Sequence, residues 1–179
     1  MNKIAAAVLE TKGDVDKAVE LLVKQKQVDA NDMANRVANT SIVYSYVHNN
    51  KVGAMIVLAC QTDFVAKNES FLNLAKNICM HIVSTPVEPG WVSEETVPLD
   101  TKEGWRSEFN REFADGKKPP QVVSKIVDGK MKKRVSEWCL ENQTFVREDG
   151  VTIGQLIKDV SATVGEKIEV KHFVKVIAK

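Results

Sequence analysis

Apolar residues recur at helical spacing through the first part of the chain. Residues 2 to 11 carry them on one face, and Gly13 is the type of residue that ends a helix in a left-handed cap. Asp14 is a good N-cap for a second helix. Its apolar stripe follows the spacing i, i+3, i+4, i+7 and comprises Val15, Ala18, Val19 and Leu22. So short a hairpin buries little by itself, so we expect it to dock elsewhere or to form part of a very small domain.

The pattern changes character near residue 41. Residues 29 to 39 still have helical spacing with small residues and predict a connecting helix. Residues 41 to 48 are rich in β-branched and aromatic residues, and residues 49 to 51 form a turn signal. The following run, Ala54 to Cys60, is nearly all apolar, as is typical of a strand covered on both faces. These segments predict a β-hairpin.

Helical patterns dominate the rest of the chain, and the last segment returns to strict alternation. The helices are expected from Asn68 to about residue 82, over 101–115, from Pro119 to Glu141 with a break or kink at Gly129, and from Thr152 to Gly165. Thr152 and Gln155 have the spacing of a capping box. The alternation predicts a final strand whose more apolar face contains Ile168, Val170, His172, Val174 and Val176.

Three strands separated by helices predict an α+β fold. A three-stranded, mainly antiparallel sheet needs helices on one face to be stable, so we expect the helices to pack against it. The expected domains are an N-terminal helical hairpin at 1–28, a connecting helix at 29–40 and an α+β core at 41–179.

Composition narrows the classes of function. The 25 Lys+Arg and 24 Asp+Glu residues leave a net charge of +1, which argues against a broad nucleic-acid-binding surface. The local basic run from Lys130 to Arg134 needs an interpretation of its own. The three cysteines and three histidines lack the spacing of a disulfide framework or a zinc site, and Cys60 is expected to be a buried thiol.

The sequence contains little that indicates a membrane protein or an enzyme. The N-terminus lacks the pattern of a signal peptide, and no apolar run approaches the ~20 residues of a membrane span. Gly150 and Gly154 lack the Gly-Lys-Ser/Thr of a phosphate loop, and neither a nucleophile elbow nor a metalloprotease motif is present. We therefore expect a soluble cytoplasmic protein that is not an enzyme, with no catalytic residue, metal, cofactor or direct nucleic-acid contact.

The segment between the second strand and the helix at Asn68 allows two interpretations. In the first, Thr62 or Asp63 caps a short turn, and Phe64 and Val65 fill the core. In the second, the turn presents the acid and the aromatic ring outward as a rigid wedge, because an exposed Phe beside a carboxylate makes a good interface anchor. Residue pattern alone leaves both open.

This segment resembles the signature of the elongation factor Ts family without departure across Cys60-Gln61-Thr62-Asp63-Phe64-Val65-Ala66-Lys67. Further matches to the family follow in chain order at Gly13 to Glu20, Gly116 to Lys133, Gln143 to Val146, Thr152 to Leu156 and Val164 to Ile168. The first of these resembles the family's N-terminal ubiquitin-associated-like domain, which usually has three helices. The second overlaps the basic run from Lys130 to Arg134, so the resemblance implies a solvated helix face there and not an RNA-binding patch. The resemblance is to the short, single-core form, with a truncated N-terminal hairpin. The short members of the family resemble homodimers, so the resemblance implies a homodimer for this chain.

The resemblance implies a guanine-nucleotide exchange factor for the translational GTPase elongation factor Tu. In that role Asp63 and Phe64 insert near the magnesium and phosphate site of the GTPase, while Thr62 and Val65 shape the turn. Further partner contacts are implied for Val164, Gly165 and the N-terminal stripe of Val15, Ala18, Val19 and Leu22. An alternative is a structural subunit that holds elongation factor Tu in a larger complex; an unrelated helical RNA-binding module is disfavoured by the balanced charge.

Overall fold

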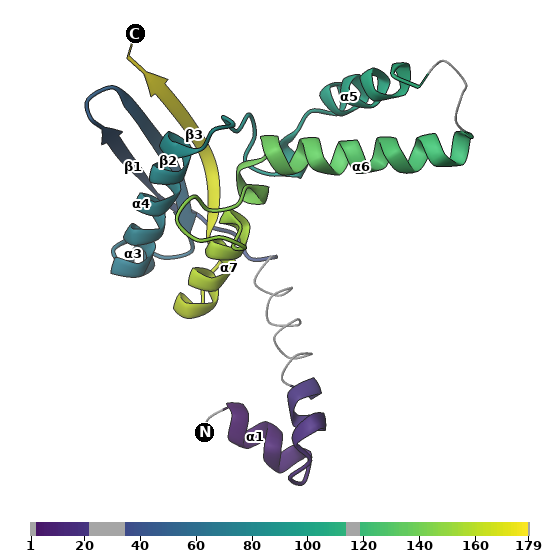
Figure 1. Cartoon of the computed structure of the whole chain (residues 1–179). Coiled ribbons are helices and arrows are strands. Elements are labelled where there is room, and N and C mark those ends of the chain that lie inside the picture. The colour runs from purple at the N-terminus through teal and green to yellow at the C-terminus, as the bar shows by residue number, and fades with distance from the viewer. Residues whose placement is uncertain (1–2, 22–34, 114–118, 179) are drawn as a thin grey trace.

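The computed structural model describes residues 3–21, 35–113 and 119–178. Figure 1 shows a sheet-and-helix core, a helical hairpin projecting from it, and residues 3–21 lying apart from the sheet. Helix α1 (Lys3–Glu10) is followed by a turn and by helical residues 15–21. Gly13 takes the expected left-handed conformation, with φ of 88°. Residues 35–39 are not helical, which corrects the end of the predicted connecting helix; its residues 29–34 and the boundary at residue 28 lie outside the described residues.

The sheet has the order β1-β2-β3, with both neighbouring pairs antiparallel. The strands are β1 (Thr40–His48), β2 (Val52–Cys60) and β3 (Glu169–Ile177). Asn49 and Asn50 connect the first two with φ of 49° and 56°, the left-handed pair that a tight hairpin turn requires and that Asn tolerates well. The predicted α+β class and three-stranded antiparallel sheet are confirmed.

Helix α4 (Glu69–Ser84) covers the inner face of the sheet by lying against β1 and β2, and α7 (Ile153–Val164) packs beside α4. Their apolar faces and the inward residues of β2 form one core cluster, which includes the fully buried Ile56, Leu58, Phe71, Leu74, Ile78, Ile82 and Ile153. Because the helices take up the inner face, the second face of the sheet is left to solvent.

Strand β3 departs from the predicted alternation at a β-bulge. Consecutive residues of β2 pair on either side of Lys171, which is therefore an extra residue in the ladder. A one-residue insertion exchanges the faces of every later side chain. Val170 is buried, but it is Phe173 that contacts the core beyond the bulge, while Val174 and Val176 are exposed on the outer face. The prediction of one apolar face along the whole strand was wrong.

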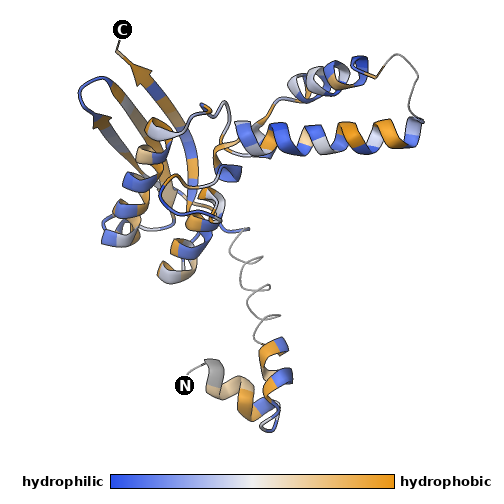
Figure 2. Ribbon diagram, viewed as in Figure 1, coloured by the Kyte–Doolittle hydropathy of each residue, from blue (hydrophilic) through white to orange (hydrophobic). Residues whose placement is uncertain are grey.

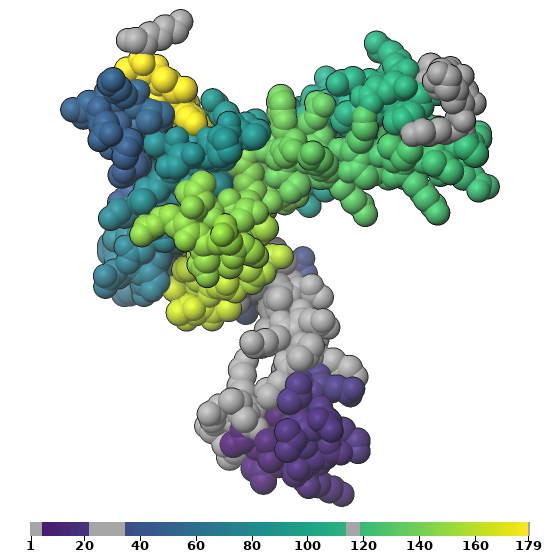
Figure 3. All heavy atoms as spheres, in the orientation of Figure 1, coloured from purple at the N-terminus to yellow at the C-terminus, as the bar shows by residue number. Residues whose placement is uncertain are grey.

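The projecting hairpin, which we call the arm, consists of α5 (Leu99–Arg111) and α6 (Pro120–Trp138). Figures 1 and 3 show it standing away from the core, and Figure 2 shows polar and apolar bands alternating along α6. Helix α6 runs through Gly129 without a break, and Figure 1 shows α6 straight along its length, so the predicted break or kink was wrong. Stacked tryptophan rings lie at the base of the arm, with the centroids of Trp91 and Trp138 6.1 Å apart.

Two members of the basic run bind within the arm rather than facing solvent alone. The guanidinium of Arg134 lies 5.0 Å from the ring centroid of Phe109 and pairs with Glu108 at 3.6 Å. Lys130 lies over the same ring and pairs with Glu112. Cation–π contacts of this kind tie α5 to α6 and leave these two side chains less available to a phosphate backbone.

His81 connects α4 to the segment after the arm. Its ring is fully buried, its Nε2 lies 2.9 Å from Oε1 of Gln143, and its Nδ1 accepts a hydrogen bond from the Val146 amide at 3.3 Å. This pairing requires a neutral ring with the proton on Nε2. Burial lowers the pKa of His81 below its ordinary value of 6.5.

The free energy of unfolding is expected to decrease as the pH falls below about 6.5. The unfolded chain then protonates His81 at a pH where the folded chain does not, so stability is fully present above the ordinary pKa and is lost as the pH approaches the lowered one. Urea unfolding at pH 7.5 and 5.5 measures the difference. In His81→Gln, which starts less stable, the decrease should be smaller; an unchanged decrease would contradict the role of this ring.

Within the described ranges, no helix combines the length and apolar character that crossing a lipid bilayer requires.

Candidate functional site

A short turn connects the central strand to the main core helix. Thr62 follows β2 with extended φ and ψ of −126° and 158°, and its Oγ1 accepts a hydrogen bond from the Val65 amide at 3.4 Å. This N-cap opens the single-turn helix α3 (Asp63–Ala66). The side chain of Asn68 then caps α4 by accepting from the Ser70 amide at 2.8 Å. The turn is therefore fixed at both ends by regular structure.

The side chains of this turn point in different directions. Val65 and Ala66 are buried and belong to the core cluster. Phe64 is 83% exposed, and the exposed Asp63 pairs with Lys67 at 3.1 Å. The interpretation in which Phe64 fills the core is therefore excluded, whereas its assignment of Val65 to the core is correct.

The end of α7 lies beside this turn. The helix ends at Val164, and Gly165 follows with φ of 74°, a left-handed conformation that glycine adopts without strain. The Glu166 carboxylate then accepts hydrogen bonds from the amides of Gln61 and Thr62, each at 3.0 Å. Two segments about a hundred residues apart in the sequence, both predicted as partner contacts, are thus brought together by the fold.

Glu166 was missed as a site residue in the sequence. It lies within the Val164 to Ile168 match, but no local pattern indicates a partner 104 residues away. Arg36 was missed for the same reason: its guanidinium donates to the carbonyl of Gly165 at 3.2 Å. Both side chains hold the neighbourhood of the turn through long-range contacts.

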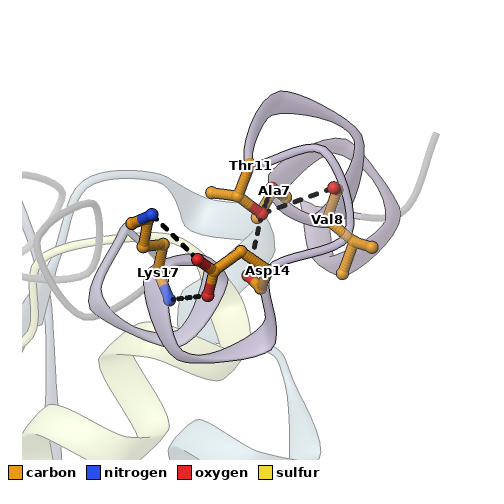
Figure 4. A network of polar contacts seen from close by, with 5 residues as sticks. All are labelled: Ala7, Val8, Thr11, Asp14 and Lys17. Atoms are coloured by element: carbon orange, nitrogen blue, oxygen red, sulfur yellow. Dashed lines mark hydrogen bonds and ion pairs between the residues drawn. The ribbon is translucent and has the colours of Figure 1, made fainter.

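The described N-terminal candidates lie within residues 3–21, which Figure 1 shows apart from the sheet and this turn. Ala18 is buried within the N-terminal part, Val15 and Val19 are exposed, and Leu22 lies outside the described residues. Figure 4 shows the polar contacts of this hairpin, in which the Asp14 carboxylate accepts from the amide of Lys17 at 3.1 Å and pairs with its ammonium at 2.9 Å. These interactions with Lys17 lower the pKa of Asp14.

The chemistry available at the turn is that of shape and charge. Cys60 lies behind it, fully buried as expected, and donates its thiol hydrogen to the Thr62 carbonyl at 3.1 Å. Burial, followed by the nearby Glu166 carboxylate, raises the pKa of this thiol, which keeps it protonated and unreactive. Among the described residues, no cluster of three His, Cys, Asp or Glu side chains could hold a metal ion.

Fold and site together define an α+β protein that carries an exposed acid–aromatic turn on a rigid core. The sequence profile of the family described as elongation factor TS matches residues 2–178. Elongation factor Ts of Petrotoga mobilis is 41% identical over 170 residues, which are 94% of this chain and 85% of that protein. Elongation factor Ts of Thermosipho melanesiensis is 37% identical over 176 residues, 98% of this chain and 89% of that protein. The chain belongs to the elongation factor Ts family.

Proposed function

We propose that this protein promotes release of GDP from the translational GTPase elongation factor Tu in the cytoplasm. The observation that carries the proposal is Phe64, a large aromatic side chain left 83% exposed next to Asp63 on a turn that is otherwise firmly anchored. Exposed aromatic rings on rigid elements are the usual anchors of protein interfaces. The protein makes and breaks no covalent bond in this role and needs no cofactor of its own.

The mechanism follows from linkage. A protein that binds the nucleotide-free GTPase more tightly than the GDP-bound form must weaken GDP binding by the same factor. In the proposed complex Phe64 enters between elements of the GTPase, and Asp63 disturbs the groups that hold its magnesium ion. Removing the metal removes the main counter-charge of the phosphates, so GDP leaves.

Two further contacts complete the proposed interface. Val164 and Gly165 directly precede Glu166, which binds the Thr62 amide, and in the proposed complex they would touch the same region of the GTPase. Val15 and Val19 are exposed and available to bind a second region, whereas the buried Ala18 supports the packing of the N-terminal hairpin. These N-terminal residues would increase affinity without acting on the nucleotide.

Release of a fluorescent GDP analogue from purified elongation factor Tu, followed by stopped flow in excess unlabelled GDP, tests the function. The observed rate constant should rise with the concentration of this chain and reach a plateau. Binding measured by calorimetry without faster release would instead support the alternative, a structural subunit that holds the GTPase in a larger complex. The absence of binding would contradict both.

We also propose that a second copy of the chain covers the outer face of the sheet. The exposed apolar residues of this face come from all three strands and comprise Val43, Val47, Met55, Val174 and Val176. Contiguous exposed apolar patches mark interaction surfaces. A two-fold dimer places the same patch on both partners, so an apolar, self-complementary face suits it.

Met55→Lys is expected to convert the dimer to a monomer in sedimentation velocity, because each interface would bury two unpaired ammonium groups. Met55 lies on the central strand and is 46% exposed. Val122→Lys is the matched control, since Val122 is 43% exposed on α6, away from this face. Wild-type chain that sediments as a monomer at roughly tens of micromolar would contradict the proposal.

A further inference from the structure

One carboxylate links the end of α7 to the beginning of α3. Oε2 of Glu166 accepts hydrogen bonds from the amides of Gln61 and Thr62, both at 3.0 Å, and its Oε1 accepts from the Thr62 hydroxyl at 2.7 Å. Three donors at the start of the turn thus converge on a single side chain. The Glu166 side chain therefore binds the base of the turn. It leaves the two outward residues alone, because Asp63 pairs with Lys67 and Phe64 is exposed.

The contact with Thr62 determines how the turn is capped. A carboxylate has no hydrogen to offer, so the Thr62 hydroxyl must donate to Glu166. Its lone pairs are then directed to accept the Val65 amide hydrogen, the cap of α3. Glu166 therefore selects the hydroxyl orientation in which Thr62 caps α3.

Glu166 is itself held firmly by its own segment. The Ser161 hydroxyl donates to the Glu166 carbonyl at 2.6 Å and accepts from the Ile168 amide at 2.9 Å. Arg36 donates to the preceding carbonyl, that of Gly165, at 3.2 Å. The position of the turn therefore depends, through the Glu166 carboxylate, on where α7 ends.

We propose that Glu166 is a positioning residue for nucleotide exchange: it holds the Thr62–Val65 turn so that Asp63 and Phe64 enter the GTPase in the productive orientation. This inference rests on the exchange function proposed above. A misplacement of about 1 Å by a group outside the reacting centre can cost about 100-fold in rate. Glu166 acts through Thr62 and through the amides it binds, so its loss should affect exchange more than folding.

The first test measures the plateau rate of GDP release with Glu166→Ala and Glu166→Gln in the full chain. The plateau should fall at least about tenfold in the alanine variant. The glutamine variant should lie between it and wild type, because one amide oxygen can still accept the backbone hydrogens. Glu169→Gln is the matched control: Glu169 pairs with Lys167 and Lys171, and its rate should be unchanged.

A combined variant separates positioning from a direct or merely structural effect. In a background that lacks both positioned side chains, Asp63→Ala with Phe64→Ala, the added Glu166→Ala should cause little further loss of rate, because the groups that it positions are already gone. An equal fold-loss on adding Glu166→Ala to this background and to wild type would overturn the proposal. So would release at the wild-type rate by Glu166→Ala.

Amide hydrogen exchange of the chain alone provides a readout that needs no GTPase. In the Glu166 variants the amides of Gln61 and Thr62 should exchange at least about tenfold faster, while the amide of Ile56 in β2 keeps its protection. Unchanged protection of Gln61 and Thr62 would overturn the positioning role. Wild-type chain that fails to accelerate GDP release would overturn the proposed function instead, so the two failures are distinguishable.

Discussion

Phe64→Ala is expected to remove most of the exchange activity while leaving the fold intact. The ring is 83% exposed, so its removal creates no cavity, and the free energy of unfolding should change by less than about 0.5 kcal/mol. An aromatic interface anchor typically contributes about 2–4 kcal/mol. If that contribution is made in the transition state for release, its loss slows GDP release by about 30- to 1,000-fold.

Phe71→Ala is the matched control, because the same side chain is removed from a fully buried position in α4. It should lower the free energy of unfolding by about 3–5 kcal/mol. Stopped-flow release and urea denaturation on both variants should therefore give opposite patterns. Normal release by Phe64→Ala would contradict the wedge, and a large loss of stability would mean that Phe64 packs in the core after all.

Local patterns predicted most of the fold because the determinants of these elements lie within a few residues. The hairpin at Asn49 and Asn50 follows from the turn chemistry of Asn, and the buried faces of α4 and α7 follow from helical periodicity. The Thr152 cap was predicted only in part. Its hydroxyl accepts from the Gln155 amide at 3.1 Å, but the Gln155 side chain binds Asp159 instead of completing the capping box.

The errors arose where tertiary contacts override local preference. Gly129 is tolerated inside α6 because contacts with α5 hold the helix on both sides of it: Asp128 pairs with Arg106 before it, and Lys130 and Arg134 form ion pairs after it. The bulge at Lys171 depends on how β3 pairs with β2, and the sequence of β3 alone does not indicate that register. The turn at Thr62–Val65 was predictable from its cap, but its bond to Glu166 depends on a fold that brings distant residues together.

Gly154→Ala is expected to lower the free energy of unfolding by about 1–3 kcal/mol, although alanine is the better helix former. A Cβ on Gly154 would lie 2.9 Å from the carbonyl oxygen of Glu141, so α7 would have to move away from the chain that precedes it. Because Glu166 directly follows the end of α7 and its cap Gly165, the same shift should also slow GDP release.

Gly129→Ala is the control, since a Cβ there meets no atom within 4 Å. This position is inside α6, so the substitution should stabilise the protein by about 0.5–1 kcal/mol through helix propensity alone. Urea denaturation of the two variants should therefore shift in opposite directions. If both substitutions stabilised the protein, α7 would be able to shift without loss of stability. The position of Glu166 would then depend on its own hydrogen bonds and not on the close approach of Gly154 to Glu141.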